Sequence, residues 1–242
     1  AGDDFINPGD NAGGVFGFDS IVTGTGNNTV NFSQISTGWA SLNYNFLDGV
    51  NPITVDIDGQ SNTGSVDMGA SGFDTLINVQ NPLNSGFTTG GLSVRGTSGD
   101  DTFNVTTDTN QWMEVRGRGG ADTINISGNG LVRIDYREGG DVTADLGAGT
   151  VTQDGFTDTI TGTVWEIRTD NGNDSVLGSS ADESFILRGG TDTVDGAGGF
   201  DRLRYDQSGL AGGVTINFNT GQATGTWNGG AFSHNFSNIE WA

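Results

Sequence analysis

The stretch that decides the fold runs from Thr169 to Arg204 and divides into four consecutive nine-residue units: TDNGNDSVL, GSSADESFI, LRGGTDTVD and GAGGFDRLR. The sixth position of every unit is acidic, at Asp174, Glu183, Asp192 and Asp201. The eighth position is apolar, at Val176, Phe185, Val194 and Leu203. Because both properties share one nine-residue period, we interpret the units as copies of one repeated structural element.

The same unit recurs at lower density outside this stretch. Four copies keep the acidic sixth and apolar eighth positions: Gly14–Ile21 with Asp19, Gly69–Leu76 with Asp74, Gly96–Phe103 with Asp101, and Gly117–Ile124 with Asp122. A further copy has the uncharged Asn28 at the acidic position. The opening Gly2–Ile6 is typical of a truncated copy, which favours a mature fragment or an excised domain.

A longer repeat is superimposed on the short one. Three related five-residue stretches alternate apolar and polar residues, as half-buried strands do: Ile53–Ile57, Val142–Leu146 and Val214–Phe218. An apolar-x-Tyr element precedes each of them, at Tyr44, Tyr136 and Tyr205. We therefore predict one elongated domain made of three degenerate modules, at about 1–91, 92–173 and 174–242.

The content and spacing of glycine argue against helix. The chain of 242 residues has 43 glycines, and no apolar stripe with a period of about 3.6 residues is sustained. Short strands separated by Gly-Asp turns at constant spacing favour a solenoid whose coils each bury an apolar residue against the next. The predicted fold is therefore all-β: a right-handed parallel β-roll or β-helix solenoid with strand-rich inserts.

Charge limits the kinds of partner that the protein can bind. All nine basic residues are arginine, and thirty acidic residues bring the net charge to −21. Such a chain repels nucleic acid and anionic membranes, so its expected charged partners are cations or basic surfaces. Cysteine is absent, which excludes disulfides and thiolate metal sites. No apolar run approaches the roughly 18 residues of a membrane helix, so we predict no membrane insertion.

Two of the units resemble a known repeat. GRGGADTI at Gly117–Ile124 and GAGGFDRL at Gly196–Leu203 are similar to the hemolysin-type (RTX) repeat, Gly-Gly-x-Gly-x-Asp-x-apolar-x, of proteins exported by bacterial type I secretion. The stretch from Gly213 resembles the strand-rich inserts that separate such repeats. The resemblance implies a secreted or cell-surface bacterial protein that binds several Ca²⁺ ions and folds after export. Because Thr169 and Leu187 stand at glycine positions of the repeat, we expect a few good calcium sites and not a continuous row.

The chemistry of calcium supports the resemblance. Ca²⁺ takes about six to eight oxygen ligands and accepts both carboxylates and the backbone carbonyls that glycine-rich turns leave accessible. If two units form one coil, Asp174 stacks below Asp192 and Glu183 below Asp201, and these carboxylates repel each other until a cation binds. Calcium binding is therefore expected to be coupled to folding. The predicted metal ligands are acidic and turn residues of the units: Asp19, Asp74, Asp101, Asp122, Asn171, Gly172, Asp174, Asp182, Glu183, Gly190, Asp192, Gly199 and Asp201.

The single histidine and the tryptophans are further candidate site residues. His234 is the only histidine, which excludes a site with several histidine ligands, and we expect it at the surface or at an end cap. Trp165 and Trp241 recur at equivalent module ends, which indicates packing. Trp112 and Trp227 do not recur in this way and are the freer candidates for stacking on a carbohydrate.

These observations favour a non-enzymatic function. The first hypothesis is a structural or adhesive extracellular module that calcium makes rigid, with no catalytic residue predicted. The second, which the family resemblance suggests, is a polysaccharide-active protein such as an alginate epimerase or lyase, or its calcium-binding accessory module. The third is a self-assembling surface layer or filament that associates through the solenoid ends. The expected partners are thus calcium, a carbohydrate or cell-surface partner, or a second copy of the chain.

Overall fold

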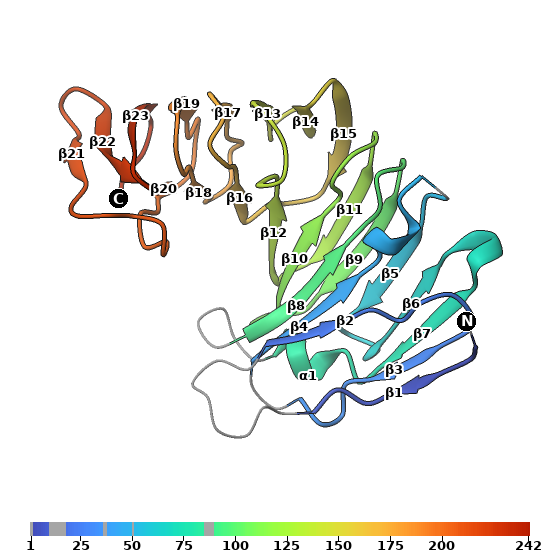
Figure 1. Ribbon diagram of the computed structural model, residues 1–242. Coiled ribbons are helices and arrows are strands. Elements are labelled where there is room, and N and C mark those ends of the chain that lie inside the picture. Colours follow the sequence, from blue (N-terminus) through green and yellow to red (C-terminus); the bar gives the residue numbers. More distant parts are fainter. Residues whose placement is uncertain (1, 10–17, 36–37, 50, 85–89) are drawn as a thin grey trace. The chain divides into compact units, whose positions relative to one another are not determined.

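The protein is all-β, as predicted, with short strands arranged in sheets that are largely parallel (Figure 1). The structure is a computed structural model and describes residues 2–9, 18–35, 38–49, 51–84 and 90–242. The chain forms two compact units, residues 1–133 and 134–242, which are described separately. The division between the units falls inside β12 (Leu131–Asp135) and within the second module predicted from the sequence.

Helical structure is minor in the described part of the chain. It consists of two 3-10 turns, η1 (Asn45–Leu47) and η2 (Gly69–Ser71), and the four-residue helix α1 (Gln80–Leu83). No helix among the described residues has the length and hydropathy needed to cross a membrane.

The first unit contains a long sheet and a second sheet. The long sheet has the order β1 (Phe5–Ile6), β3 (Thr29–Asn31), β7 (Phe73–Ile77), β6 (Thr63–Asp67), β5 (Thr54–Asp58), β9 (Thr102–Thr107) and β11 (Thr123–Gly128). The second sheet is parallel, in the order β2 (Phe18–Ile21), β4 (Gly38–Asn43), β8 (Gly90–Arg95) and β10 (Trp112–Arg116). Along β9, Phe103 and Val105 are buried while Thr102 and Asn104 are partly exposed, so the alternation of the sequence separates core from surface.

The second unit repeats this arrangement. Its long sheet has the order β15 (Phe156–Thr161), β14 (Thr150–Gln153), β13 (Val142–Asp145), β17 (Ser175–Leu177), β19 (Thr191–Asp195), β23 (Gly230–Ser237), β22 (Gln222–Trp227) and β21 (Thr215–Asn217). Its second sheet is formed by β16 (Glu166–Arg168), β18 (Ser184–Ile186) and β20 (Arg202–Leu203), all parallel.

The four uninterrupted nine-residue units alternate between these two sheets of the second unit. The first and third units supply β17 and β19, which pair in parallel with Val176 opposite Val194. The second and fourth supply β18 and β20, with Phe185 opposite Leu203. Paired residues are thus 18 positions apart, which is the offset expected if two units make one coil. All four eighth-position side chains are buried.

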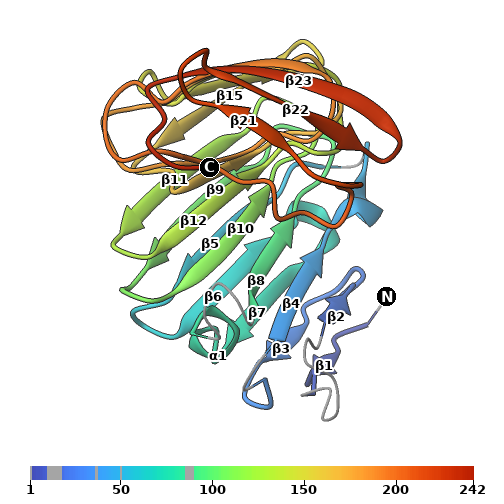
Figure 2. The same ribbon diagram turned by 90° about the vertical axis from the view of Figure 1, so that its left-hand side faces the viewer.

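The three related five-residue stretches each begin an antiparallel meander. The meanders are β5–β6–β7, β13–β14–β15 and β21–β22–β23, and Figure 2 shows the last of them side by side. Glycines at positive φ close two of the first hairpins, Gly149 at +69° and Gly221 at +63°. A Cβ at either position would lie 2.2 Å from a carbonyl oxygen of the third strand, so a larger residue would not fit. These meanders interrupt the parallel pairing that the nine-residue units produce.

Candidate metal centre

The acidic sixth positions form a buried ladder along the stacked turns. The Oδ1 atom of Asp192 accepts a hydrogen bond from the backbone N–H of Asp174 at 2.9 Å. In the same way, Oδ1 of Asp201 accepts from the N–H of Glu183 at 2.8 Å. The structure therefore brings Asp174 to Asp192 and Glu183 to Asp201, the two stacked pairs expected from an 18-residue coil. We call these carboxylates, with their equivalents elsewhere in the chain, the buried ladder.

The buried ladder also includes residues of the sparser repeats. In the first unit, Oδ1 of Asp122 accepts from the N–H of Asp101, and Oδ1 of Asp101 accepts from the N–H of Ile53, both at 2.8 Å. Asp74 accepts from both the backbone and the side-chain amide of Asn28. Each acidic residue thus receives a backbone N–H from a preceding segment, and this role requires an acceptor oxygen but no charge.

A second row, the outer ladder, lies one residue earlier in the turns. The Oδ1 atom of Asp182 accepts from the N–H of Phe200 at 2.8 Å, and Oδ1 of Asp141 accepts from the N–H of Asn173 at 2.8 Å. Here the donor comes from the later segment, opposite to the direction of the buried ladder. Asp182, predicted as a metal ligand, therefore belongs to the outer ladder, where its carboxylate stabilises the following turn.

Close packing explains why glycine precedes the acidic residue by five positions. A Cβ on Gly96 would lie 2.3 Å from Oδ2 of Asp101, and a Cβ on Gly196 would lie 2.6 Å from Oδ2 of Asp201. Real Cβ atoms do not approach oxygen so closely, so the carboxylate occupies the space that a side chain would need. At these two positions packing requires glycine whether or not an ion binds, whereas the turns with Thr169 and Leu187 accommodate a side chain there.

The other turn residues on the predicted list also have packing roles. Gly190 and Gly199 have positive φ, at +113° and +124°. A Cβ on Gly190 would lie 1.8 Å from the carbonyl oxygen of Gly172, and a Cβ on Gly199 would lie 2.2 Å from that of Ala181. Asn171 lies in the same turn as Gly172 and is exposed. These residues let neighbouring turns approach closely and bring their carbonyl oxygens near the ladders.

One group of ladder carboxylates has its hydrogen-bonding capacity filled. Asp101 accepts from the N–H of Thr97 at 2.6 Å on Oδ2 and from the Thr97 hydroxyl at 2.9 Å on Oδ1. Glu183 accepts from the N–H and the hydroxyl of Ser179. In both cases the donor residue stands four positions before the carboxylate, so the turn satisfies its own acidic residue.

A second group leaves one buried oxygen open. The Oδ2 atoms of Asp174, Asp192 and Asp201 are buried and accept no hydrogen bond from any described residue. For Asp192 this oxygen lies 3.0 Å from Nε2 of His234, which can serve as its partner. Asp201 therefore has the carboxylate oxygen that is most available to a cation, followed by Asp174, whose carboxylate has the Thr169 hydroxyl nearby.

Burial raises the pKa values of several ladder carboxylates. Burial raises the pKa of Asp174 to about 6, opposed by the nearby hydroxyl of Thr169 and the N–H of Val142, and the carboxylates of Asp192 and Asp141 raise it further. Burial likewise raises the pKa of Asp201, with the N–H of Glu183 acting against it. A bound cation would favour the ionised forms and lower these pKa values.

The donor atoms around these two aspartates have the chemistry that calcium prefers. The point where a Cβ of Gly196 would lie is 2.1 Å from the carbonyl oxygen of Asn238 and 2.6 Å from Oδ2 of Asp201. A Cβ on Gly172, two positions before Asp174, would lie 2.9 Å from Oδ1 of both Asp141 and Asp174. These two oxygens also accept from the N–H groups of Asn173 and Val142. Hard oxygen donors of this kind suit Ca²⁺. Across the described residues, no three acidic or histidine side chains converge on one ion, so carbonyl oxygens and water would complete the coordination.

Asp19 is placed differently from the other predicted ligands. It lies in β2 of the second sheet of the first unit, and its partner across the sheet on β4 is Ala40. No second carboxylate therefore follows it at the paired position. Gly14, the first residue of the same repeat copy, lies outside the described residues.

Sequence reasoning missed a set of buried tyrosine contacts. The hydroxyl of Tyr44 donates to Oδ2 of Asp74 at 2.9 Å, and that of Tyr136 donates to Oδ2 of Asp158 at 2.7 Å. Both acceptors lie on the third strand of a meander. The recurrence of tyrosine before each meander was the available signal, but the hydrogen-bond partner of each tyrosine could not be predicted from it.

In the third module a histidine replaces the acidic partner. Tyr205 Oη lies 3.0 Å from Nδ1 of His234, whose Nε2 lies 3.0 Å from Asp192. His234 is fully buried and stacks on Phe232. The expectation of a surface histidine was therefore wrong, because the ring links a tyrosine to the buried ladder.

The expectation about the free tryptophans was also wrong. Trp112 is fully buried and Trp227 is only 6% exposed. The guanidinium of Arg133 lies 4.8 Å from the ring centre of Trp112, and that of Arg188 lies 5.2 Å from the ring of Trp227. Both indoles are thus core residues covered by an arginine.

Comparison with known proteins adds no assignment to these features. No family model matches the sequence, and the search of curated proteins found no match.

Proposed function

We propose that this protein is a secreted, calcium-binding β-roll of the hemolysin-type repeat class that serves as a structural or adhesive extracellular module. The observation that carries the proposal is the buried Oδ2 atom of Asp174 and of Asp201, which accepts no hydrogen bond from the described residues. In a chain with a net charge of −21, a divalent cation is the natural partner for such oxygens.

The energetics of burial support a role for the ion in folding. An ionised carboxylate that is buried without full compensation destabilises the folded state by several kcal/mol, roughly. A cation that binds only the folded chain offsets this cost and adds stability in proportion to the logarithm of its concentration. Calcium would thus promote folding outside the cell and leave the chain less stable where calcium is scarce.

The proposal assigns the ions to two places in the second unit. Asp174, with Asp141 beside it, would hold one ion, and Asp201, with the carbonyl oxygen of Asn238, would hold the other. Asp101 and Glu183 are less suited, because donors within their own turns already satisfy their oxygens. A small number of sites is also what the departures from the repeat predict.

A structural role fits the buried Asp192–His234–Tyr205 chain better than a catalytic one. Its members lie within hydrogen-bonding distance of one another and could form a proton relay. Asp192 and His234 are both fully buried, and a substrate must reach the reacting group. We therefore assign this chain of side chains to the core of the second unit.

The test is a calcium titration of chelated protein, followed by far-UV circular dichroism and thermal unfolding, with magnesium as the ionic control. Calcium should raise the Tm specifically. The double variant Asp174→Asn, Asp201→Asn should lose most of this increase, because asparagine keeps the Oδ1 acceptor of the ladder and removes the second carboxylate oxygen.

Asp58→Asn is the matched control for the loss of charge. Asp58 ends β5 and accepts from the N–H groups of Gln60 and Ser61 in the exposed turn that follows, and an amide oxygen can do the same. This variant should keep the full response to calcium. A Tm of the unsubstituted protein that is identical with calcium and with chelator would refute the calcium assignment.

A further inference from the structure

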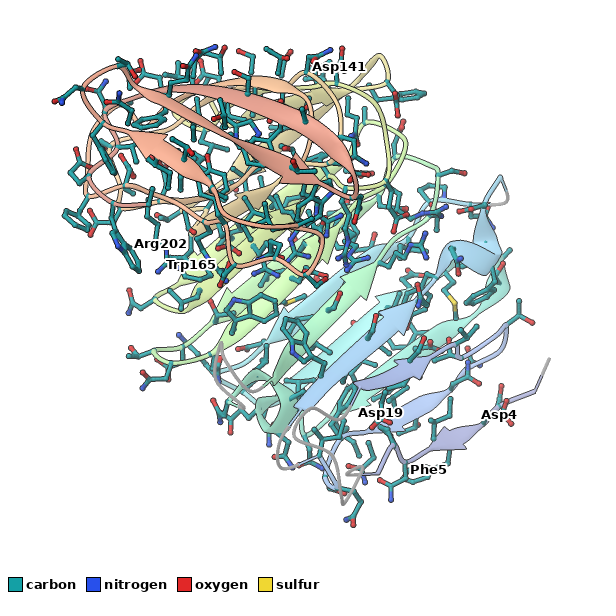
Figure 3. All side chains as sticks on the ribbon, turned by 60° about the vertical axis from the view of Figure 1, so that its left-hand side comes forward. Asp4, Phe5, Asp19, Asp141, Trp165 and Arg202 are labelled. Carbon is teal, nitrogen blue, oxygen red and sulfur yellow. The ribbon has the colours of Figure 1, made fainter. Side chains whose placement is uncertain are left out.

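An arginine lies between two tryptophans on the second sheet of the second unit. The guanidinium carbon of Arg202 is 5.0 Å from the ring centre of Trp165 and 5.7 Å from that of Trp241. Figure 3 shows Arg202 next to Trp165. Trp241 is bridged to Arg202 through the backbone and is 55% exposed. The tryptophans predicted to pack at module ends therefore form, with Arg202, a surface feature that includes a largely accessible indole.

Arg202 has no carboxylate counter-ion among the described residues. Its Nε donates to the hydroxyl of Ser184 at 3.0 Å. Its neighbour Arg204, by contrast, pairs with Glu166 at 2.7 Å and with Asp206. Burial lowers the pKa of Arg202 and the positive charge of Arg204 lowers it further, whereas the carboxylates of Glu166 and Asp206 raise it. The Ser184 hydroxyl in turn donates to Glu166 at 2.7 Å, so the guanidinium of Arg202 interacts with this carboxylate only indirectly. A guanidinium without a direct ion pair is complementary to an anionic ligand.

The combination of groups selects the class of ligand. An exposed indole offers a flat apolar surface with polar surroundings, which suits the apolar face of a sugar ring. A guanidinium recognises a carboxylate through two parallel hydrogen bonds. A protein partner would need a contact of about 800 Å² on each side, far more than one indole and one guanidinium provide.

We propose that Trp165, Arg202 and Trp241 form a binding subsite for a carboxylated sugar ring, such as a uronic acid residue of a polysaccharide. Arg202 pairs with the carboxylate, Trp241 stacks on the ring, and Trp165 packs against the guanidinium. The subsite goes beyond the proposed function, because it requires the folded second unit but no bound calcium. It would supply the ligand that an adhesive module needs.

The experiment is a calorimetric titration with oligogalacturonate, in calcium and in chelator, with the uncharged oligogalactose of the same length as the control ligand. Binding of oligogalacturonate should be at least about tenfold tighter than that of oligogalactose, since one charge-assisted contact corresponds to this factor. Arg202→Gln and Trp241→Ala should each weaken it about tenfold or more. Arg202→Lys should restore part of the affinity, because it keeps the charge and loses the planar fork.

Arg188→Gln is the matched control, because Arg188 also lies over an indole but pairs with Asp170 at 3.3 Å. It should bind as the unsubstituted protein does. Circular dichroism of every variant separates loss of the subsite from loss of the fold. Equal affinity for the charged and uncharged ligands, or unchanged binding by Arg202→Gln, would overturn the proposal. Failure of the unsubstituted, folded protein to bind oligogalacturonate would overturn it as well, independently of the calcium result.

Discussion

Asp101 in the first unit and Asp201 in the second occupy the same position of the repeat but have different surroundings. Each follows a glycine by five residues, and each accepts a backbone N–H from a preceding segment. Asp101 also accepts hydrogen bonds from the N–H and the hydroxyl of Thr97, and we call such a turn closed. The equivalent residue before Asp201 is Ala197, which has a φ of +63° and donates its N–H to Asp195. The turn at Asp101 thus supplies hydrogen-bond donors to both oxygens of its carboxylate, whereas the turn at Asp201 leaves one carboxylate oxygen without a donor.

The comparison separates two roles that the repeat combines. The glycine and the first carboxylate oxygen belong to the packing of the turns and occur in both places. Only the second oxygen distinguishes a candidate cation site from a closed turn, and it depends on the residue four positions earlier. The Gly-Asp spacing therefore identifies the ladder, and it does not by itself identify a metal site.

The largest effect is expected from filling the space that both turns share. Gly96→Ala and Gly196→Ala should each lower the free energy of unfolding by about 3 kcal/mol, because the new Cβ would overlap the ladder carboxylate. For Gly96→Ala the loss should be similar in calcium and in chelator, whereas for Gly196→Ala it should be larger in calcium, because the Cβ would also fill the space beside Asp201 and Asn238 that is assigned to the ion. Urea unfolding followed by circular dichroism measures it. Gly213→Ala is the control, since a Cβ there meets no atom within 4 Å. A large loss at only one of the two glycines would show that the turns are not equivalent in packing.

Much of the repeat geometry could be predicted from the sequence because it depends on local periodicity. The nine-residue period placed Val176 and Phe185 in the core, and it correctly predicted the stacking of Asp174 with Asp192. These features follow from the regular spacing of apolar and acidic residues, and every copy of the repeat predicts the same structure. Repetition therefore compensated for the weak signal of any single turn.

The features that could not be predicted depend on contacts distant in sequence or on backbone conformation. The positive φ of Ala197 turns its N–H away from Asp201, and alanine rarely adopts this conformation. The burial of His234 depends on pairing between β19 and β23, which are neighbours in the sheet but are separated in sequence by β20, β21 and β22. The alternation in Val142–Leu146 predicted a strand but carried no information that its next neighbour would be antiparallel.

A pH titration in chelator should reveal the cost of the buried charges in both kinds of turn. Burial raises the pKa of both Asp101 and Asp174 from 3.8 to about 6. Because the folded state binds the proton more tightly, the stabilisation from each group is complete below about pH 4 and is lost as the pH rises through 6. Each group contributes at most about 3 kcal/mol to this loss. The midpoint of urea unfolding, measured from pH 4 to pH 7, should therefore fall as the pH increases.

In calcium, the pH dependence of stability should persist for the turn of Asp101 and disappear for that of Asp174. At Asp174 a bound ion removes the cost of ionisation, whereas the closed turn of Asp101 keeps it. In saturating calcium, Asp101→Asn should therefore still flatten the pH profile, and Asp174→Asn should no longer do so. A profile that responds equally to both substitutions in calcium would contradict the distinction between closed and open carboxylates.

The smallest effect is expected from opening the closed turn. Thr97→Ala removes the hydroxyl that donates to Asp101 and keeps the backbone N–H, so one hydrogen bond to a buried charge is lost. The free energy of unfolding at pH 7 should fall by about 1 to 2 kcal/mol, as measured by urea unfolding in chelator. Thr109→Ala, in an exposed turn of the same unit, should change it by less than about 0.5 kcal/mol.

If calcium restores the lost stability of Thr97→Ala, the threonine hydroxyl and the ion are alternative partners for the same carboxylate. If calcium has no effect on this variant, closing a turn and binding an ion require different backbone conformations, as the opposite signs of φ at Thr97 and Ala197 would then imply.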